Sequence, residues 1–173
     1  MISMILAAVT AVLVLVGDRI SKIYVLNNFT LAESHDFIPG VIDFTFVNNS
    51  GGAWGLLSGH LWILLSVSIL AMMVCIALLI KYGLENKLMF WAVLLVLSGG
   101  IGNMYDRIFY GGEVVDFIHL SFMPWFPVFN IADCAIVIGG ALFVWYFMLS
   151  TIQDSRSTKH IAYSTTDDEP HND

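Results

Sequence analysis

Long runs of apolar residues divide the chain into segments that are long enough to cross a membrane. A helix rises about 1.5 Å per residue, so roughly 20 residues span a hydrocarbon core of about 30 Å. The runs of this length extend from Ile2 to Leu26, Leu61 to Ile80, Leu88 to Tyr105 and Ile131 to Ile152. A closed barrel would show alternating segments of about ten residues, which these runs lack, so we expect four transmembrane helices.

The first run is also compatible with a cleaved signal peptide, because Met1 to Val16 has the length of its apolar region. No basic region precedes this run, however, and the helical pattern continues through Asp18 and Lys22. We therefore expect the first helix to be retained.

Between the runs the pattern changes. Residues 42–46 alternate apolar and polar side chains after a Pro39-Gly40 turn, which predicts a half-buried strand. Residues 117–126 are apolar but too short and broken to span a bilayer, and suit its interface. The pattern therefore predicts a membrane all-α fold with four transmembrane helices, a small extracytoplasmic β element and an interfacial segment.

The composition agrees with a protein surrounded by lipid. Hydrophobic residues make up 58% of the 173 residues and charged residues 12%, about half the usual share. Residues 154–173 contain five acidic and two basic side chains, so −3 of the net charge of −7 lies there. The remaining −4 leaves no basic face for nucleic acid. We expect one membrane domain over residues 1–153 and a disordered acidic cytoplasmic tail over residues 154–173.

Basic residues outside the runs predict the orientation. Lys81 and Lys87 lie between the second and third runs, and Arg156 and Lys159 follow the fourth, whereas residues 27–60 contain no Lys or Arg. The positive-inside rule then predicts cytoplasmic termini and an outer side formed by residues 27–60 and 107–130. We expect a monomer, because no exposed heptad or repeated GxxxG face is found.

Charged residues lie within or at the ends of these apolar runs, where they are costly. A charge in the middle of a membrane helix costs about 2.5–3.5 kcal/mol even on the permissive insertion scale, so each one is a functional candidate. Asp18 and Lys22 are four residues apart, which predicts an ion pair on one helix face. For this pair an architectural role is favoured over a catalytic one.

The third run ends in small and polar residues. Ser98 and Gly102 have the spacing of close helix contacts, and Asp106 and Arg107 follow. Asn103 and Arg107, four residues apart, share a helix face and suit binding of a peptide backbone. The alternative for Arg107 is snorkelling to the interface.

Two further acids lie among apolar residues on the predicted outer side. Asp116 lies in VVDFIHL, and Asp133 lies at the start of the fourth run, where Asn130 is positioned to cap the helix. Asp133 also suits the helix dipole. Two carboxylates that share one proton are what an acid/base hydrolase needs, since the ionised one accepts a proton from water while the protonated one polarises the carbonyl.

Other chemistries have less support in the sequence. His119 is a lone candidate zinc ligand near Asp116, and Lys22 with Ser50 or Ser58 lacks a G-x-S-x-G elbow. A proton-conducting membrane protein would explain the buried acids, but not why they gather at the outer ends of the runs. An inert membrane scaffold would not explain the polar groups placed there at a cost.

Five motifs occur in order along the chain: DRISK, VNNSGGAWG, GGIGNMYDR, VVDF and FNIAD. Together they resemble the lipoprotein signal peptidase (signal peptidase II) family of bacterial membrane aspartic endopeptidases. The resemblance implies four helices with an outer β-sheet cradle in the bacterial inner membrane. It also implies cleavage of diacylated prolipoproteins just before the lipidated cysteine.

The resemblance further implies the roles of individual residues. Asp116 and Asp133 correspond to the catalytic dyad. Asn49, Asn103, Arg107 and Asn130 would bind substrate or position the acids, and Asp18, Lys22 and Asp106 would support the architecture. No metal or organic cofactor is expected, and the partners implied are prolipoproteins, the lipid bilayer and the peptide inhibitor globomycin.

The chain departs from the usual family pattern at a few positions. Arg19 stands where Gln is common, Gly52 where Ala is common and Trp54 where Phe is frequent. Ser98 and Gly100 depart from the glycine-alanine sequence that usually precedes the GN pair of the third motif. None of these positions is one of the two aspartates. Gly52 and Trp54 are the departures expected to alter the shape of the substrate side.

Overall fold

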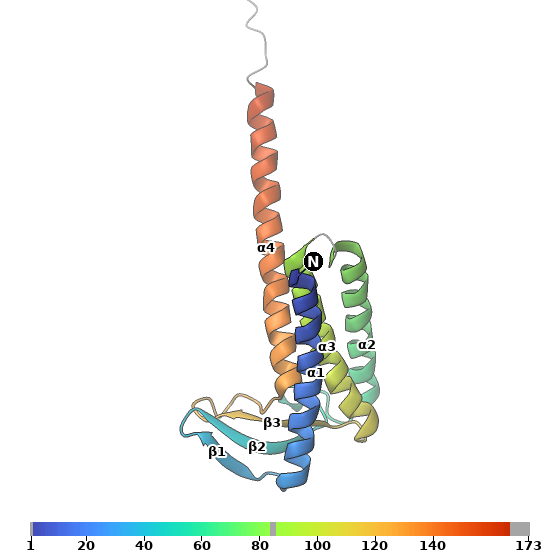
Figure 1. Ribbon diagram of the computed structural model, residues 1–173, viewed down its shortest axis with the longest axis vertical. Helices are drawn as coiled ribbons and strands as arrows, with labels where there is room; N and C mark the ends of the chain where they lie inside the picture. Colours follow the sequence, from blue (N-terminus) through green and yellow to red (C-terminus); the bar gives the residue numbers. More distant parts are fainter. Residues whose placement is uncertain (1, 84–85, 167–173) are drawn as a thin grey trace, which may run out of the picture.

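Four helices and three strands make up the computed structural model, which describes the backbone of residues 2–83 and 86–166 (Figure 1). The helices are α1 (Ile2–Asn28), α2 (Leu61–Leu78), α3 (Lys87–Phe109) and α4 (Ile131–Thr166). The strands are β1 (Ser34–Ile38), β2 (Ile42–Asn49) and β3 (Val114–Leu120). A short helical turn, Ala53–Gly55, follows β2, and the π-helical segment Leu79–Gly83 extends α2. Each of the four predicted spans is confirmed as a helix long and apolar enough to cross a membrane.

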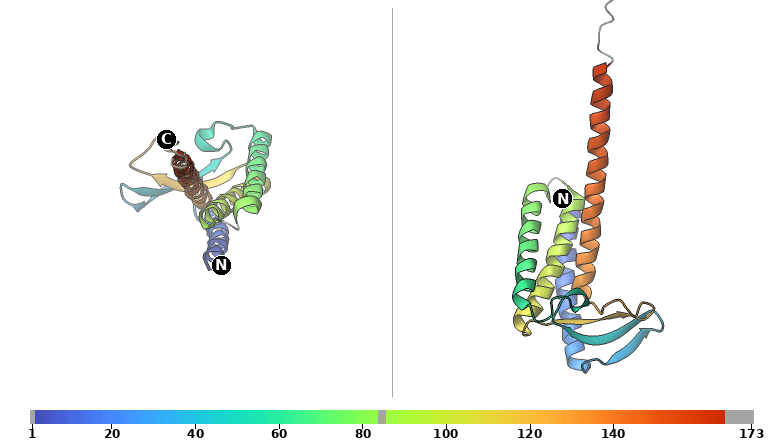
Figure 2. Two further views of the ribbon diagram at one scale, coloured as in Figure 1. Left: turned by 90° about the horizontal axis from the view of Figure 1, so that it is seen from above. Right: turned by 180° about the vertical axis from the view of Figure 1, so that it is seen from behind.

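Helix α3 is the centre of the bundle. In the apolar stretch of α3, 39% of the residues are buried, compared with 6% in that of α2. Helices α1, α2 and α4 surround α3 (Figure 2). Glycines allow the closest approach between α3 and α4. A Cβ atom at Gly139 would lie 2.7 Å from the carbonyl oxygen of Ala92, and one at Gly99 would overlap the carbonyl oxygen of Ala132. Only residues without a side chain fit at these crossings.

The outward faces of the helices are apolar and open. Trp62 on α2 is 79% exposed and Val137 on α4 is 70% exposed. Surfaces of this kind are stable in lipid, where an apolar side chain needs no cover from protein.

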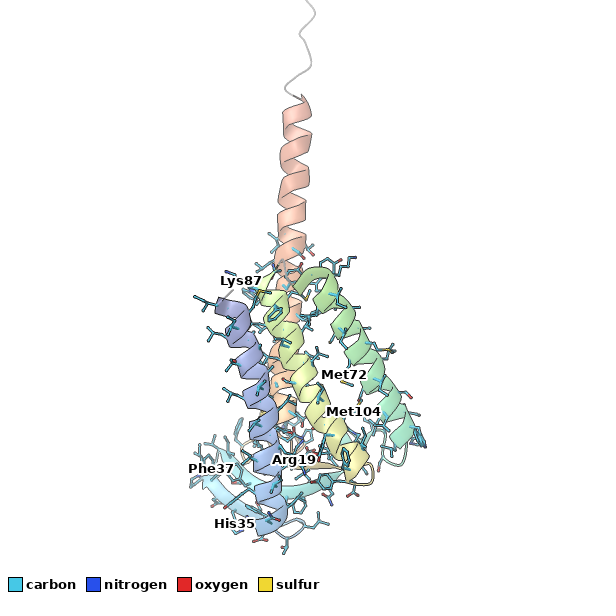
Figure 3. All side chains as sticks on the ribbon, turned by 45° about the vertical axis from the view of Figure 1, so that its right-hand side comes forward. Arg19, His35, Phe37, Met72, Lys87 and Met104 are labelled. Atoms are coloured by element: carbon cyan, nitrogen blue, oxygen red, sulfur yellow. The ribbon has the colours of Figure 1, made fainter. Side chains whose placement is uncertain are left out.

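The strands form an antiparallel sheet in the order β1-β2-β3, which lies across one end of the bundle (Figures 1 and 2). Figure 3 shows Arg19, His35 and Phe37 toward this end and Lys87 at the opposite end. A small core formed by Val25, Phe46, Val115 and Phe117 joins the sheet to α1. Burying these side chains is worth roughly 1.5–3 kcal/mol each.

The strand predicted over residues 42–46 is confirmed within β2. By contrast, Phe117 to Leu120, which we expected in an interfacial segment, belong to β3, and Ile118, His119 and Leu120 pair with β2. Strand pairing provides hydrogen-bond partners for the backbone N–H and C=O groups of this apolar stretch. In an unpaired segment at the interface these groups would have to bond to water. The pairing also places Asp116 opposite Val47, two residues before Asn49.

Helix α4 continues to Thr166, which differs from the expectation of disorder from residue 154. Extending an existing helix requires no new nucleation, so the polar residues after Ile152 can continue the hydrogen-bond ladder. Residues 167–173 of the predicted tail lie outside the described residues.

Candidate active site

Asp116 and Asp133 line one cavity between the sheet and the bundle. Asp116 lies in the middle of β3 and is 1% exposed, whereas Asp133 lies in the first turn of α4 and is partly exposed. The cavity has a volume of about 540 Å³. Both acids predicted from the sequence are therefore brought to the same space, although 17 positions separate them.

The cavity is apolar apart from a few polar groups. Trp54 and Phe126, with ring centroids 6.0 Å apart, form part of its wall. Val137 and Ile138 of α4 also line it, and both are more than half exposed on the outside of the bundle. The cavity is thus bordered by residues that are exposed on the outer surface of the bundle.

Side-chain amides hold the two carboxylates. Asn49 donates a hydrogen bond of 2.8 Å from Nδ2 to Oδ2 of Asp116, and Asn130 donates one of 2.6 Å to Oδ1. Asn103 donates a hydrogen bond of 2.7 Å from Nδ2 to Oδ1 of Asp133. The three asparagines proposed from the sequence therefore all contact the acids directly.

Asn130 also caps α4, as its position in the sequence predicts. The backbone N–H of Asp133 donates to Oδ1 of Asn130 at 2.9 Å, and Oδ2 of Asp133 accepts from the backbone N–H of Asn130 at 3.1 Å. This reciprocal pair has the geometry of a capping box, with Asp133 at the N3 position. The cap fixes the side chain of Asp133 relative to that of Asn130 and, through Asn130, relative to Asp116.

The environment of Asp116 favours its protonated form. Burial first, and then the nearby carboxylate of Asp133, raise the pKa of Asp116, whereas the hydrogen bonds from Asn49 and Asn130 lower it, and the net result is a pKa of about 7. A carboxyl group with this pKa can hold a proton near neutral pH and release it within a reaction cycle.

Arg107 lines the same cavity and has unused donors. Its side chain is buried, and one terminal nitrogen donates a long bond of 3.4 Å to the carbonyl oxygen of Asn103. Its Nε has no hydrogen-bond partner within the described part of the chain. A buried donor without a partner is costly, so Arg107 is suited to donate a hydrogen bond to an acceptor in the cavity.

A separate charge cluster lies next to the dyad and consists of Asp18, Arg19, Lys22 and Asp106. Lys22 Nζ lies 2.9 Å from Asp18 Oδ2 and 2.8 Å from Asp106 Oδ2, which confirms the predicted pair within α1 and adds a second partner from α3. Arg19 lies 3.3 Å from Asp106 and donates to the Tyr110 hydroxyl. Two acids and two bases leave the cluster without net charge.

Asp18 also reaches α4. Its Oδ1 accepts a hydrogen bond of 2.9 Å from the backbone N–H of Ala132, the residue before Asp133. Gly102 makes room for this contact, because a Cβ atom there would lie 2.9 Å from the Asp18 carboxylate. The predicted close contact at Gly102 is confirmed. Ser98, the other residue of the predicted spacing, is buried and donates its hydroxyl to the carbonyl oxygen of Leu95, and the neighbouring Gly99 makes the close approach to α4.

The residues of the rival chemistries are engaged elsewhere. Nδ1 of His119 lies 3.5 Å from Asp43, and the hydroxyls of Ser50 and Ser58 bond to each other. Lys22 is held within the charge cluster. Among the side chains that the structure describes, no group of three or more His, Cys, Asp or Glu residues is arranged to hold a metal ion.

Comparison with known proteins gives a consistent result. A family model described as signal peptidase II matches residues 10–149. The chain is 38% identical over 143 residues to the lipoprotein signal peptidase of Clostridium acetobutylicum, which covers 82% of this chain and 92% of that protein. It is 41% identical over 148 residues to that of Syntrophomonas wolfei, covering 84% and 94%. A solved structure described as a bacterial membrane enzyme matches with a TM-score of 0.79 at 32% identity, covering 84% of this chain and 88% of that one.

Proposed function

The chain belongs to the signal peptidase II family of lipoprotein-processing proteases, and we propose that Asp116 and Asp133 carry out its peptide hydrolysis as an aspartic dyad. The observation that carries this proposal is the pair of carboxylates lining one cavity, held by carboxamides and by the start of α4. Carboxamides fix the acids in place without adding a positive charge at bonding distance, so one proton can be shared between them.

The reaction follows from a dyad in which Asp116 holds the proton. Ionised Asp133 accepts a proton from water as the water oxygen bonds to the scissile carbonyl carbon, and Asp116 donates its proton to the carbonyl oxygen. Asp133 then protonates the leaving nitrogen, the C–N bond breaks, and a hydroxyl of the intermediate returns a proton to Asp116. The cycle consumes one water molecule and restores the dyad, and none of its proton transfers needs a further group.

The cavity suits a substrate that arrives within the membrane. Its border of exposed α4 side chains gives a transmembrane signal peptide a lateral route to the dyad. Arg107 would donate to a backbone carbonyl of that peptide, or of globomycin bound in its place. Cleavage just before a diacylated cysteine fits a site at this end of the bundle, because the lipid chains can stay in the bilayer.

The orientation follows the positive-inside rule. Lys87 lies at the end of the bundle opposite the sheet (Figure 3), so the sheet and the dyad are at the outer face of the inner membrane and both termini are cytoplasmic. The domain over residues 1–153 acts as a monomer, and residues after it are dispensable for cleavage.

The test is cleavage of a diacylated prolipoprotein by the purified enzyme, with globomycin as the inhibitor. Asp116→Asn and Asp133→Asn each preserve size and should lower kcat on the order of 10⁴-fold, as loss of a central catalytic group does. Asp36→Asn, on the exposed strand β1, is the matched control and should cleave normally. Cleavage at the wild-type rate by either dyad variant would refute the assignment.

A further inference from the structure

Lys22 makes three polar contacts, and one of them leads out of the charge cluster. Two are the salt bridges to Asp18 and Asp106. The third is a hydrogen bond of 3.1 Å from Nζ to Oδ1 of Asn103, a residue that lines the cavity. An ammonium group has three donors, so each is used, and the third points toward the dyad.

Asn103 continues this contact to Asp133. Its Oδ1 accepts from Lys22 and from Asn130 Nδ2 at 3.0 Å, while its Nδ2 donates to Asp133 at 2.7 Å. An ammonium only donates and an ionised carboxylate only accepts. The reversed carboxamide would place N–H groups against Lys22 and an oxygen against Asp133, so the two charges together determine which way Asn103 points.

The contact also strengthens the hydrogen bond that Asp133 receives. A carboxamide whose oxygen accepts from a cation is a stronger donor at its nitrogen, because hydrogen bonds in a chain polarise one another. The Lys22 side chain is 0% exposed, so bulk water does not screen its charge.

We propose that Lys22 is a positioning residue for hydrolysis, which through Asn103 orients and strengthens the hydrogen bond to Asp133 and so keeps Asp133 the proton acceptor. The inference rests on the proposed dyad and goes beyond the architectural role that the salt bridges imply. The charged groups that act on Asp133 are Asp116 from β3, Arg107 from α3 and Lys22 from α1. Of the two cations, Lys22 is the one that reaches Asp133 through a side-chain carboxamide.

The experiment compares two double variants with the same change in charge. K22Q/D18N replaces the cation and one acid by amides that can keep the hydrogen bonds to Asp106, Asn103 and Ala132. R19Q/D18N neutralises the same acid and the other cation of the cluster, which has no contact with Asn103. For each purified variant, thermal unfolding in detergent and the kcat and KM for a diacylated prolipoprotein are measured.

We expect K22Q/D18N to fold and to lose roughly 10- to 100-fold in kcat, the scale of one charge-assisted hydrogen bond, with KM within about threefold of wild type. R19Q/D18N should retain kcat within about threefold. A folded K22Q/D18N enzyme with the kcat of R19Q/D18N would overturn the proposal, because a purely architectural Lys22 predicts no difference between folded variants.

Asn103→Asp tests the same path if K22Q/D18N does not fold. This variant keeps acceptors for Lys22 and Asn130 and removes the N–H that reaches Asp133. We expect a kcat loss of at least 10-fold with little change in KM. An unchanged kcat overturns the proposal by itself. These outcomes are separate from failure of the dyad, which would appear as activity in Asp133→Asn.

Discussion

Asp18 and Asp106 differ from Asp116 and Asp133 in their partners, although all four lie at the sheet end of the molecule. Both carboxylate oxygens that Lys22 contacts belong to the first pair, and Arg19 adds a second cation. The second pair is hydrogen-bonded to side-chain amides and to the start of α4. A cation at contact distance favours the charged form of an acid, whereas a neutral carboxamide only donates a hydrogen bond to it. The difference separates acids that hold helices together from acids suited to proton transfer.

The largest loss of stability is expected when Lys22, the cation between Asp18 and Asp106, is removed. Lys22→Met leaves two buried acids with Arg19 as their remaining cation, and we expect it to lower the free energy of unfolding by about 3–5 kcal/mol. Chemical denaturation in detergent measures this loss. Asp116→Asn, which removes an acid without leaving a charge unpaired, should not destabilise the protein to this extent. Equal stability of Lys22→Met and wild type would contradict the architectural role.

The pH dependence of stability sharpens the comparison. Because the pKa of Asp116 is raised from 3.8 to about 7, its contribution to stability is fully present below about pH 4 and is lost as the pH rises to 7. The expected loss is at most about 4 kcal/mol. Asp116→Asn should not show this loss. The difference in the free energy of unfolding between wild type and variant, measured across pH 4–7.5, therefore isolates it. A constant difference would mean that the folded protein does not favour protonated Asp116.

Catalysis should lose its proton donor over the same range. As the pH rises through about 7, Asp116 ionises and kcat/KM should fall. This fall is the alkaline limb of the pH profile of kcat/KM. The hydrogen bond from Asn49 stabilises ionised Asp116, so Asn49→Ala should move this limb upward by roughly one pH unit. Asn48→Ala, on the neighbouring exposed position of β2, is the control and should leave the limb in place. A limb that moves equally in both variants would argue against the contact with Asn49.

The smallest effect is expected at the edge of the charge cluster. The Arg19 side chain is 31% exposed, and it lies 4.6 Å from the ring centre of Tyr105 in addition to its contact with Asp106. A partly exposed pair and a cation–π contact are each worth at most about 1 kcal/mol. Arg19→Gln should therefore lower stability by about 1 kcal/mol, measured as for Lys22→Met. A loss as large as that of Lys22→Met would place Arg19 at the centre of the cluster.

Local patterns predicted much of the molecule. Span length, the pair of Asp18 with Lys22 and the cap of Asn130 on α4 each depend on residues within a few positions of one another, so helix geometry alone relates them. The motifs likewise indicated the residues of the site. The strand β3 was missed, because a short apolar stretch has no signal of its own until a neighbouring strand pairs with it.

The sequence by itself determined that the chain is a four-span membrane protein, and it indicated which acids matter. The reason is that lipid imposes a fixed helix length and a high cost on charge. Only the tertiary structure decided which polar side chains from other elements meet at the site. Lys22 and Asn103 are 81 positions apart, and Asn49 and Asp116 are 67 apart. Such contacts follow from the packing of α1, α3 and the sheet, which no local pattern specifies, and it is this packing that separates the two pairs of aspartates.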